Sequence, residues 1–234
     1  MADAVQLTYR DETGAPQTVG AVDAGRIDFA RVEPSRAFPS YRGQRNFPGH
    51  YMAECSRRMI EFESWLERDE AMAMDHDPLV EAFAAQPFLL EWVDHTGRCK
   101  HTPDFFARRR DGTCVVVDCR PEDRIAPRDR ELFDGTAQIC ATLGWEFRLV
   151  HRHDPVWLAN AWWLAGYRLT RFRIEPIASA LLLAAADPCP LVWAAAQVGE
   201  PIAVLPVLYH LLWRGDLQAN LNERLDGLTV VRTA

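Results

Sequence analysis

Two aspartates and an arginine that lie close together in the sequence have the clearest capacity for chemistry. Asp104 follows a His-Thr-Pro triplet, and fourteen residues later the chain reads Asp118-Cys119-Arg120. Side chains alternate along a strand, so Asp118 and Arg120 are predicted to share one face. A carboxylate that closes an apolar strand is costly to bury without a partner. Mg²⁺ would be a suitable partner, because it prefers hard oxygen ligands and lowers the pKa of a bound water.

A third acid could come from the helix predicted before these strands. Glu63 and Glu67 are four residues apart, so they would share one face of a helix over 59–74. Such a pair is either part of the same acidic site or a solvated helix face, and the pattern allows both readings.

The elements that must position these residues follow from periodicity and turn signals. Asp111-Gly112 predicts a tight hairpin turn, and Val115-Val116-Val117 predicts a buried strand. The expected order is a helix over 59–74, strands over 88–93, 99–108 and 113–119, a helix over 127–143, a strand over 146–151 and a helix over 156–167. Hairpins make part of the sheet antiparallel, and the helix before the last strand allows a parallel crossover. The predicted fold class is α/β, a mixed sheet flanked by helices.

The two ends of the chain have different patterns. Residues 1–48 read as two short strands, over 4–10 and 26–32, followed by a lead-in rich in Arg, Pro and Gly. The last segment carries little charge and predicts helices over 177–186, 191–198 and 202–214, then strands over 218–221 and 229–232. Three helices and a terminal hairpin are the plan of a winged helix-turn-helix. We therefore expect three regions, 1–48, 49–172 and 173–234.

Taken in order, these motifs carry a resemblance to a known family. A helix glutamate, a Pro-Asp pair and an Asp-x-Arg triplet resemble the PD-(D/E)XK restriction-endonuclease-like fold. Over residues 40–234 the chain also resembles the TnsA-like endonuclease subunits of heteromeric transposases, which have a C-terminal winged-helix domain. The motifs that carry this resemblance are Glu63 to Asp69, Asp77-Pro78, Gln86-Pro87, His101 to Phe105, and Asp154-Pro155 followed by Asn160 and Trp163.

The resemblance implies a set of site residues. Glu67 matches the helix glutamate, with Glu63 as the competing helix acid. Asp104 matches the metal-binding aspartate, and Asp118 matches a position usually held by Glu or Gln. The backbone carbonyl of Cys119 would be a further metal ligand. Arg120 replaces the family's lysine, and an arginine keeps the charge but cannot donate a proton.

The same resemblance implies a function. The chain would be a DNA endonuclease that uses Mg²⁺, with Mn²⁺ as an alternative metal, and cuts the 5′ ends of a mobile element. Its partners would be double-stranded DNA at the transposon ends, a transposase subunit of the integrase type and an AAA+ ATPase regulator. Two alternatives stay open: a catalytically inactive subunit that serves assembly or targeting, and a stand-alone restriction or defence nuclease.

The formal net charge of −7 argues against a general DNA-binding surface, but the charge is unevenly distributed. Residues 31–60 sum to +4 and residues 98–128 to +3, whereas residues 61–97 sum to −9. The basic segments hold the candidate DNA contacts, which are Arg42, Arg45, Arg108, Arg109 and Arg110. A solvated loop and a solvated hairpin tip would explain these arginines as well.

The predicted last helix is too apolar to read base edges, which requires polar side chains. Leu205, Leu208 and Leu212 are therefore candidates for docking onto a protein partner. Runs of apolar residues are far shorter than a membrane span, and the N-terminus has no basic region before an apolar stretch. These patterns predict a cytoplasmic protein without a membrane segment.

Overall fold

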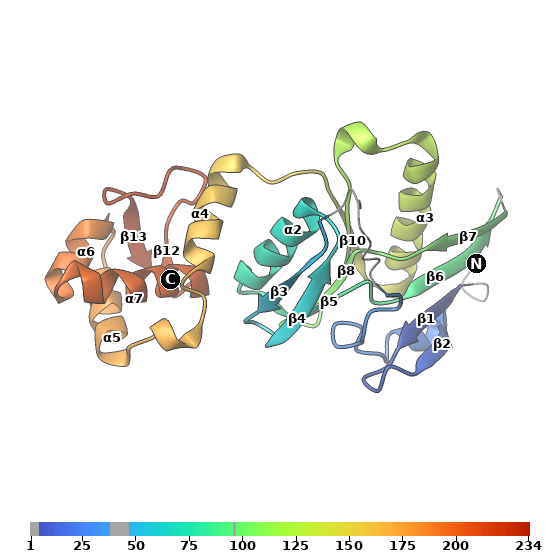
Figure 1. Ribbon diagram of the computed structural model, residues 1–234, viewed down its shortest axis with the longest axis horizontal. Helices are drawn as coiled ribbons and strands as arrows, with labels where there is room; N and C mark the ends of the chain where they lie inside the picture. The colour runs from blue at the N-terminus through green and yellow to red at the C-terminus, as the bar shows by residue number, and fades with distance from the viewer. Residues whose placement is uncertain (1–4, 38–46, 96) are drawn as a thin grey trace. The chain divides into compact units, whose positions relative to one another are not determined.

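The computed structural model describes residues 5–37, 47–95 and 97–234, and it shows a mixed α/β protein (Figure 1). The chain divides into two compact units, residues 1–152 and residues 153–234. Seven α-helices and several sheets lie within the described residues.

The sheet that positions the acidic residues lies in the first unit, in the order β10-β9-β8-β5. Its strands are β5 (Val80–Ala85), β8 (Phe105–Arg109), β9 (Cys114–Cys119) and β10 (Glu146–Val150). β5 and β8 are antiparallel, as are β8 and β9, whereas β10 is parallel to β9. Helix α3 (Pro127–Leu143) makes the crossover, after a 3₁₀ turn at Glu122–Arg124. The predicted mixed sheet with a parallel crossover is confirmed, but the strand expected over 88–93 does not belong to it, and β5 takes the place of that strand.

A second, antiparallel sheet has the order β2-β1-β6-β7. Its strands are β1 (Gln6–Arg10), β2 (Pro16–Gly20), β6 (Leu89–Asp94) and β7 (Gly97–His101). The single strand expected over 99–108 is therefore wrong, because β7 and β8 belong to different sheets. Pro103 lies at the break; it lacks an N–H to donate to a ladder and restricts the residue before it.

The strand expected over 26–32 is also wrong. The short helix α1 (Ala21–Ala24) comes first, and residues 26–31 then form turns in which Asp28 accepts from the N–H of Ala30 at 3.3 Å. Phe29 has no exposed surface and makes edge contacts with Phe88, Phe106 and Trp145, with ring centroids 4.9 to 5.8 Å apart. This turn thus supplies the aromatic centre of the core.

The helix expected over 59–74 begins later than predicted. Residues 58–62 form β4 (Arg58–Phe62), which pairs antiparallel with β3 (Gly49–Ala53), and helix α2 covers Trp65–His76. Ile60 and Phe62 are buried while Met59 is 60% exposed, the alternation of a strand. Ser64 then caps the helix by accepting from the Glu67 N–H at 3.2 Å.

The second unit contains four helices and a small three-stranded sheet. The helices are α4 (Pro155–Ala165), α5 (Glu175–Ala184), α6 (Leu191–Val198) and α7 (Pro201–Arg214), with a 3₁₀ turn at Thr170–Phe172. The strands are β11 (Cys189–Pro190), β13 (Val230–Thr233) and β12 (Leu217–Gln218), in that order. Within the described residues, no helix is long and apolar enough to cross a lipid bilayer.

Helix α4 belongs to the second unit, so the boundary lies before the expected position at 172/173. The Asn160 amide donates to the carbonyls of Leu221 and Glu223 at 2.9 and 2.6 Å, and its oxygen accepts from the Leu225 N–H at 3.1 Å. These bonds attach α4 to the loop between β12 and β13.

The docking role expected of α7 is wrong for two of its three residues. Leu208 is fully buried and Leu212 is 4% exposed, because α7 is surrounded by α4, α5, α6 and β12. Leu205 is half-buried. The apolar character of this helix reflects its place in the core.

A stability measurement tests this assignment. We expect Leu208→Ala to lower the free energy of unfolding by about 2–5 kcal/mol, because a buried leucine leaves a cavity. The matched control is Ile202→Ala on the same helix, where the side chain is 89% exposed and the expected change is within about 0.5 kcal/mol. Urea unfolding followed by circular dichroism gives both values. Equal, small effects would contradict the burial of Leu208.

Candidate active site

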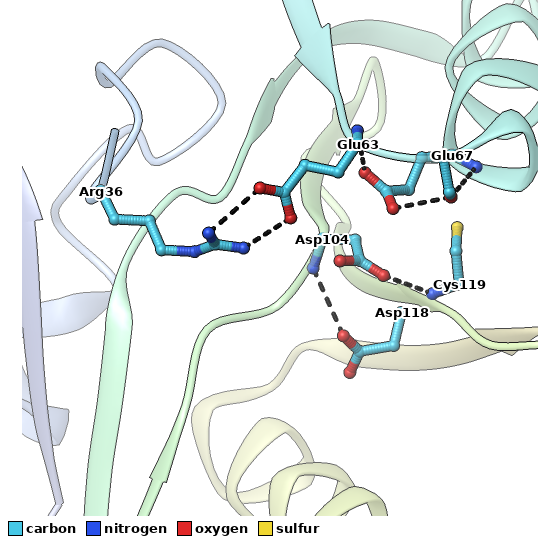
Figure 2. Close-up of polar contacts among 7 residues, drawn as sticks. Arg36, Glu63, Glu67, Asp104, Asp118 and Cys119 are labelled. Atoms are coloured by element: carbon cyan, nitrogen blue, oxygen red, sulfur yellow. Dashed lines mark hydrogen bonds and ion pairs between the residues drawn. The ribbon is translucent and has the colours of Figure 1, made fainter. Parts of the chain in front are cut away.

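Three carboxylates come together in the first unit from three separate elements (Figure 2). Glu67 lies in the first turn of α2, Asp104 lies just before β8, and Asp118 lies in β9. Glu67 and Asp118 are 8% and 2% exposed, and Asp104 is partly buried. The structure therefore brings together the acids that the sequence predicted at separate positions.

The pairing of β8 with β9 places the two aspartates. Phe105 is opposite Val117 in the antiparallel register, so Asp104 and Asp118 come next to each other at the end of the ladder. The Asp104 Oδ2 atom accepts from the Cys119 N–H at 2.7 Å, and the Asp104 N–H donates to Asp118 Oδ1 at 3.3 Å. These two bonds hold both carboxyl groups at one end of the sheet.

Glu67 is held by the cap of its own helix. Its Oε1 atom accepts from the Ser64 hydroxyl at 2.7 Å, and its Oε2 atom accepts from the Glu63 N–H at 2.8 Å. Together with the bond from the Glu67 N–H to Ser64, this is a reciprocal N-cap. Burial raises the pKa of Glu67, the two bonds oppose that shift, and the nearby Glu63 charge adds to it.

Negative charge is concentrated around Asp104. Burial, and then the charges of Glu67 and Asp118, raise its pKa well above the usual range, while the Cys119 N–H and Arg120 act in the opposite direction. The thiol of Cys119 responds to the same field, since burial and then Asp104 raise its pKa. Burial and the mutual repulsion of the carboxylates therefore favour the uptake of a positive charge by this cluster, either a proton or a cation.

Arg120 and Glu63 occupy different positions beside this cluster. The Arg120 side chain is exposed, and its charge lowers the pKa of Asp104. Glu63 is paired with Arg36 through two bonds of 2.7 and 3.1 Å (Figure 2). Glu67 is thus the helix acid directed toward the aspartates, and Glu63 is engaged with an arginine that the sequence analysis did not assign to the site.

His101 is a further site residue that the sequence analysis missed. Its Nε2 atom is 2.8 Å from Asp118 Oδ2, and its ring contacts Phe133 edge-on at 5.9 Å. A single strand through 99–108 would have placed His101 and Asp104 on opposite faces, since they are three residues apart. The break at Pro103 instead directs both toward Asp118. The signal available in the sequence was a histidine two residues before the Pro103-Asp104 pair.

A double-mutant cycle tests this contact. We expect His101→Leu to lower the free energy of unfolding by about 1.5–3 kcal/mol, because it leaves the buried Asp118 oxygen without its partner. In an Asp118→Asn background the same substitution should lower the free energy of unfolding by less. The difference between the two losses is the coupling energy of His101 and Asp118. Thermal and urea unfolding of the four proteins measure it. Additive effects would contradict a direct interaction.

The candidate DNA contacts at the hairpin tip lie away from the acids. Arg108 is 3.3 Å from Asp28, Arg109 is 2.9 Å from Glu146, and the Arg110 Nε atom donates to the Pro78 carbonyl at 2.9 Å. Four residues of extended chain separate Arg108 from Asp104, a distance of about 13 Å. These arginines therefore lie at a distance from the acids, and their role as DNA contacts stays a prediction. Arg42 and Arg45, the other candidates, lie outside the described residues.

The donor atoms are of the type that a hard divalent cation prefers, but they are not arranged to chelate one. Carboxylate and carbonyl oxygens are the ligands that Mg²⁺ prefers. Among the residues that the structure describes, no three His, Cys, Asp or Glu side chains are arranged to hold a metal. Both Glu67 oxygens are bonded within the helix cap, and one Asp118 oxygen faces His101. Metal binding would require these side chains to rotate.

Comparison with known proteins gives no family for this chain. It matches no protein-family model and has no significant match among curated proteins. Its function has to be inferred from the residues of the site and from the resemblance in its sequence motifs.

Proposed function

We propose that this chain is a Mg²⁺-dependent DNA endonuclease subunit of a heteromeric transposase, with Mn²⁺ as an alternative metal. The observation that carries the proposal is the meeting of Glu67, Asp104 and Asp118 at one end of the sheet. Three neighbouring carboxylates, whose burial and mutual repulsion raise the pKa of Asp104, can be neutralised by a cation. The sequence resemblance assigns this set of residues to a PD-(D/E)XK nuclease.

The order of elements supports the same proposal. Helix α2, strands β5, β8 and β9, helix α3 and strand β10 follow the α-β-β-β-α-β order expected of that nuclease core. Strands β6 and β7 are inserted between β5 and β8 and pair in the second sheet. The acids lie at the N-terminus of α2 and at the ends of β8 and β9 that meet.

Each residue can be given a role in phosphodiester hydrolysis. Glu67, Asp104, Asp118 and the Cys119 carbonyl would hold the metal, which supplies charge neutralisation and a water of lowered pKa. The Arg120 guanidinium would donate hydrogen bonds to the phosphate and stabilise charge as it develops, without transferring a proton. The Cys119 N–H fixes the orientation of Asp104 through its 2.7 Å bond.

The second unit is proposed to be a winged-helix domain that docks onto the transposase subunit. Helices α5, α6 and α7 followed by β12 and β13 are in the order of that plan. Since most apolar residues of α7 are buried, this helix is a poor candidate for reading base edges. The proposed partners are an integrase-type transposase, its AAA+ ATPase regulator and double-stranded transposon ends.

A cleavage assay tests the proposal. The purified chain is mixed with its transposase partner and a supercoiled plasmid that carries the element's ends, in Mg²⁺, in Mn²⁺ and in EDTA. We expect new 5′ ends at the element boundaries with either metal and none in EDTA. The proposal would be contradicted if cleavage persists in EDTA. It would also be contradicted if the transposase partner makes the same cuts without this chain.

An inactive assembly subunit is the second candidate, and one observation favours it. Within the described part of the chain no three side chains are ready to hold a metal, and arginine stands in place of the expected lysine. This candidate predicts that neither Mg²⁺ nor Mn²⁺ changes the melting temperature. It also predicts that removal of residues 153–234 abolishes partner binding. A shift of the melting temperature with Mg²⁺ would exclude it.

A further inference from the structure

A glutamine bonded to Asp104 through its backbone has a buried side-chain amide without a partner. Gln86 is 2% exposed, and within the described residues neither its Nε2 nor its Oε1 atom has a hydrogen-bond partner. Such an amide is costly to bury, because it has lost its hydrogen bonds to water. Its backbone also has a φ of 46°, in the left-handed region that residues other than glycine rarely adopt. Gln86 therefore carries a cost that no contact within the described chain offsets.

The sheet places Gln86 in one row with the two aspartates of the cluster. The register of β5 with β8 pairs Ala85 with Phe105, so Gln86 comes opposite Asp104, which itself comes opposite Asp118. The Gln86 N–H donates to the Asp104 carbonyl at 2.8 Å, and the Asp104 N–H donates to Asp118 Oδ1 at 3.3 Å. Residues opposite each other on neighbouring strands have their side chains on one face of a sheet. This row therefore gathers the amide and the two carboxyl groups at the same end of the sheet.

The carboxylates of the cluster are already engaged, whereas the Gln86 amide is not. Both Glu67 oxygens accept bonds within the helix cap. Asp118 contacts His101 through one oxygen and the Asp104 N–H through the other. An amide oxygen is a hard donor of the kind that divalent cations such as Mg²⁺ bind. The Gln86 oxygen can therefore become a ligand without the loss of an existing hydrogen bond.

We propose that the side-chain amide of Gln86 is a further ligand of the divalent cation at the acid cluster, with its oxygen as the donor atom beside Asp104. This inference rests on the proposed nuclease function and adds a neutral ligand to its metal site. A single ion suits this position better than DNA, because an amide that is 2% exposed is out of reach of the phosphates of a double helix. The Gln86-Pro87 pair is among the motifs that carry the sequence resemblance, and the proposal gives it a role in the site.

Stability and metal-binding measurements on Gln86→Met test the proposal. Methionine is also unbranched but apolar, so the variant removes two unsatisfied polar atoms from the interior. We expect the melting temperature in EDTA to rise by about 2 °C or more. The affinity for Mn²⁺, measured by electron paramagnetic resonance from the signal of the free ion, should fall by about tenfold or more. A variant less stable than the wild type in EDTA would show that the amide serves the structure, and it would contradict the proposal.

A second variant and a control separate the oxygen donor from general packing. Gln86→Glu keeps an oxygen donor and adds a charge, so it should bind Mn²⁺ at least as tightly as the wild type. Its melting temperature in EDTA should fall, because the new carboxylate is buried beside Asp104. Gln138→Met makes the same exchange as Gln86→Met at an exposed position of α3 and should change neither measurement. The inference is wrong if Gln86→Met binds Mn²⁺ as the wild type does, if Gln86→Glu binds it less tightly than Gln86→Met, or if the wild type binds none.

The same proteins distinguish this inference from the function on which it rests. If Mg²⁺-dependent cleavage occurs with the partner but Gln86→Met binds Mn²⁺ as the wild type does, the nuclease stands and the glutamine is not a ligand. If Mn²⁺ binding depends on Gln86 but no metal supports cleavage with the partner present, the ligand assignment stands and the nuclease proposal is wrong.

Discussion

Replacing Asp104 with asparagine is expected to abolish cleavage and, in the absence of metal, to stabilise the protein. The carboxyl group is enclosed with Glu67 and Asp118, and burial and their charges raise its pKa. An amide has no charge to desolvate, and its oxygen can still accept from the Cys119 N–H. We therefore expect the melting temperature in EDTA to rise. Cleavage should fall by about a hundredfold or more, because a proposed metal ligand and its charge are lost.

The response to metal makes this prediction specific. Mg²⁺ should raise the melting temperature of the wild type, since binding to the folded state alone stabilises it. In Asp104→Asn that rise should be absent or much smaller. Thermal unfolding in EDTA and at increasing Mg²⁺, with cleavage measured in parallel, gives both readouts. A variant that is less stable than the wild type in EDTA, or that keeps the full Mg²⁺ response, would contradict the site.

Asp75→Asn is a matched control within the same unit. Asp75 is 5% exposed and accepts from the Tyr51 hydroxyl at 2.9 Å and from the Cys55 N–H at 2.8 Å. Asparagine loses the charge that strengthens both bonds and must turn its amide nitrogen toward the Tyr51 oxygen, so the variant should lose about 1–3 kcal/mol of stability. Its Mg²⁺ response should match the wild type. Opposite stability changes at Asp104 and Asp75 would then distinguish a carboxylate whose charge serves binding from one whose charge serves the structure.

Local sequence signals were sufficient to predict the elements that carry Asp104 and Asp118. Helix α3 begins at Pro127 and ends before Gly144, which has a φ of 72°, and both ends were predicted because proline and glycine mark them. The valine run predicted β9, and the Asp111-Gly112 turn predicted its hairpin with β8. The meeting of Asp104 with Asp118 follows from that hairpin and needs no long-range information.

The features that could not be predicted depend on contacts between residues far apart in the chain. β6 pairs with β1, a strand far away in the chain, and this draws β6 and β7 into a second sheet. Only with that sheet in place does His101 point toward Asp118. Similarly, the apolar residues of α7 match both a docking surface and a core helix, and only the packing of the neighbouring helices shows that Leu208 is buried.

The start of α2 was predicted too early because the apolar pattern over 59–74 changes from the period of a strand to that of a helix. Ile60 and Phe62 face inward with period two in β4, whereas Met72 and Met74 are buried in a helix, so one window over 59–74 averages two structures. The Ser64 cap with Glu67 three residues later is the signal that separates them. Correcting the boundary matters for function, because it makes Glu67 a residue of the first helical turn, where its side chain reaches back to the cap.

Substitutions at Arg120 are expected to have the second largest effect on cleavage, because this residue stands at the position where the resemblance expects the lysine of a PD-(D/E)XK nuclease. Arg120→Ala should lower the single-turnover cleavage rate by about 10²–10³-fold, the typical loss for one group that stabilises transition-state charge. Arg120→Lys keeps the charge and adds a group able to donate a proton, so it should retain most of the activity. The control is Arg124→Ala, an exposed arginine in the following 3₁₀ turn, which should cleave as wild type does.

The metal-free protein provides an independent readout of the same residue. Arg120 lowers the pKa of Asp104, so its charge offsets part of the repulsion within the cluster. Arg120→Ala should therefore lower the melting temperature in EDTA, and this loss should shrink when Asp104 is already asparagine. If Arg120→Lys is as inactive as Arg120→Ala but matches the wild type in stability, the site needs the forked geometry of a guanidinium. Arginine at this position would then indicate an active nuclease adapted to it. In an inactive protein, arginine and lysine would give the same absence of cleavage.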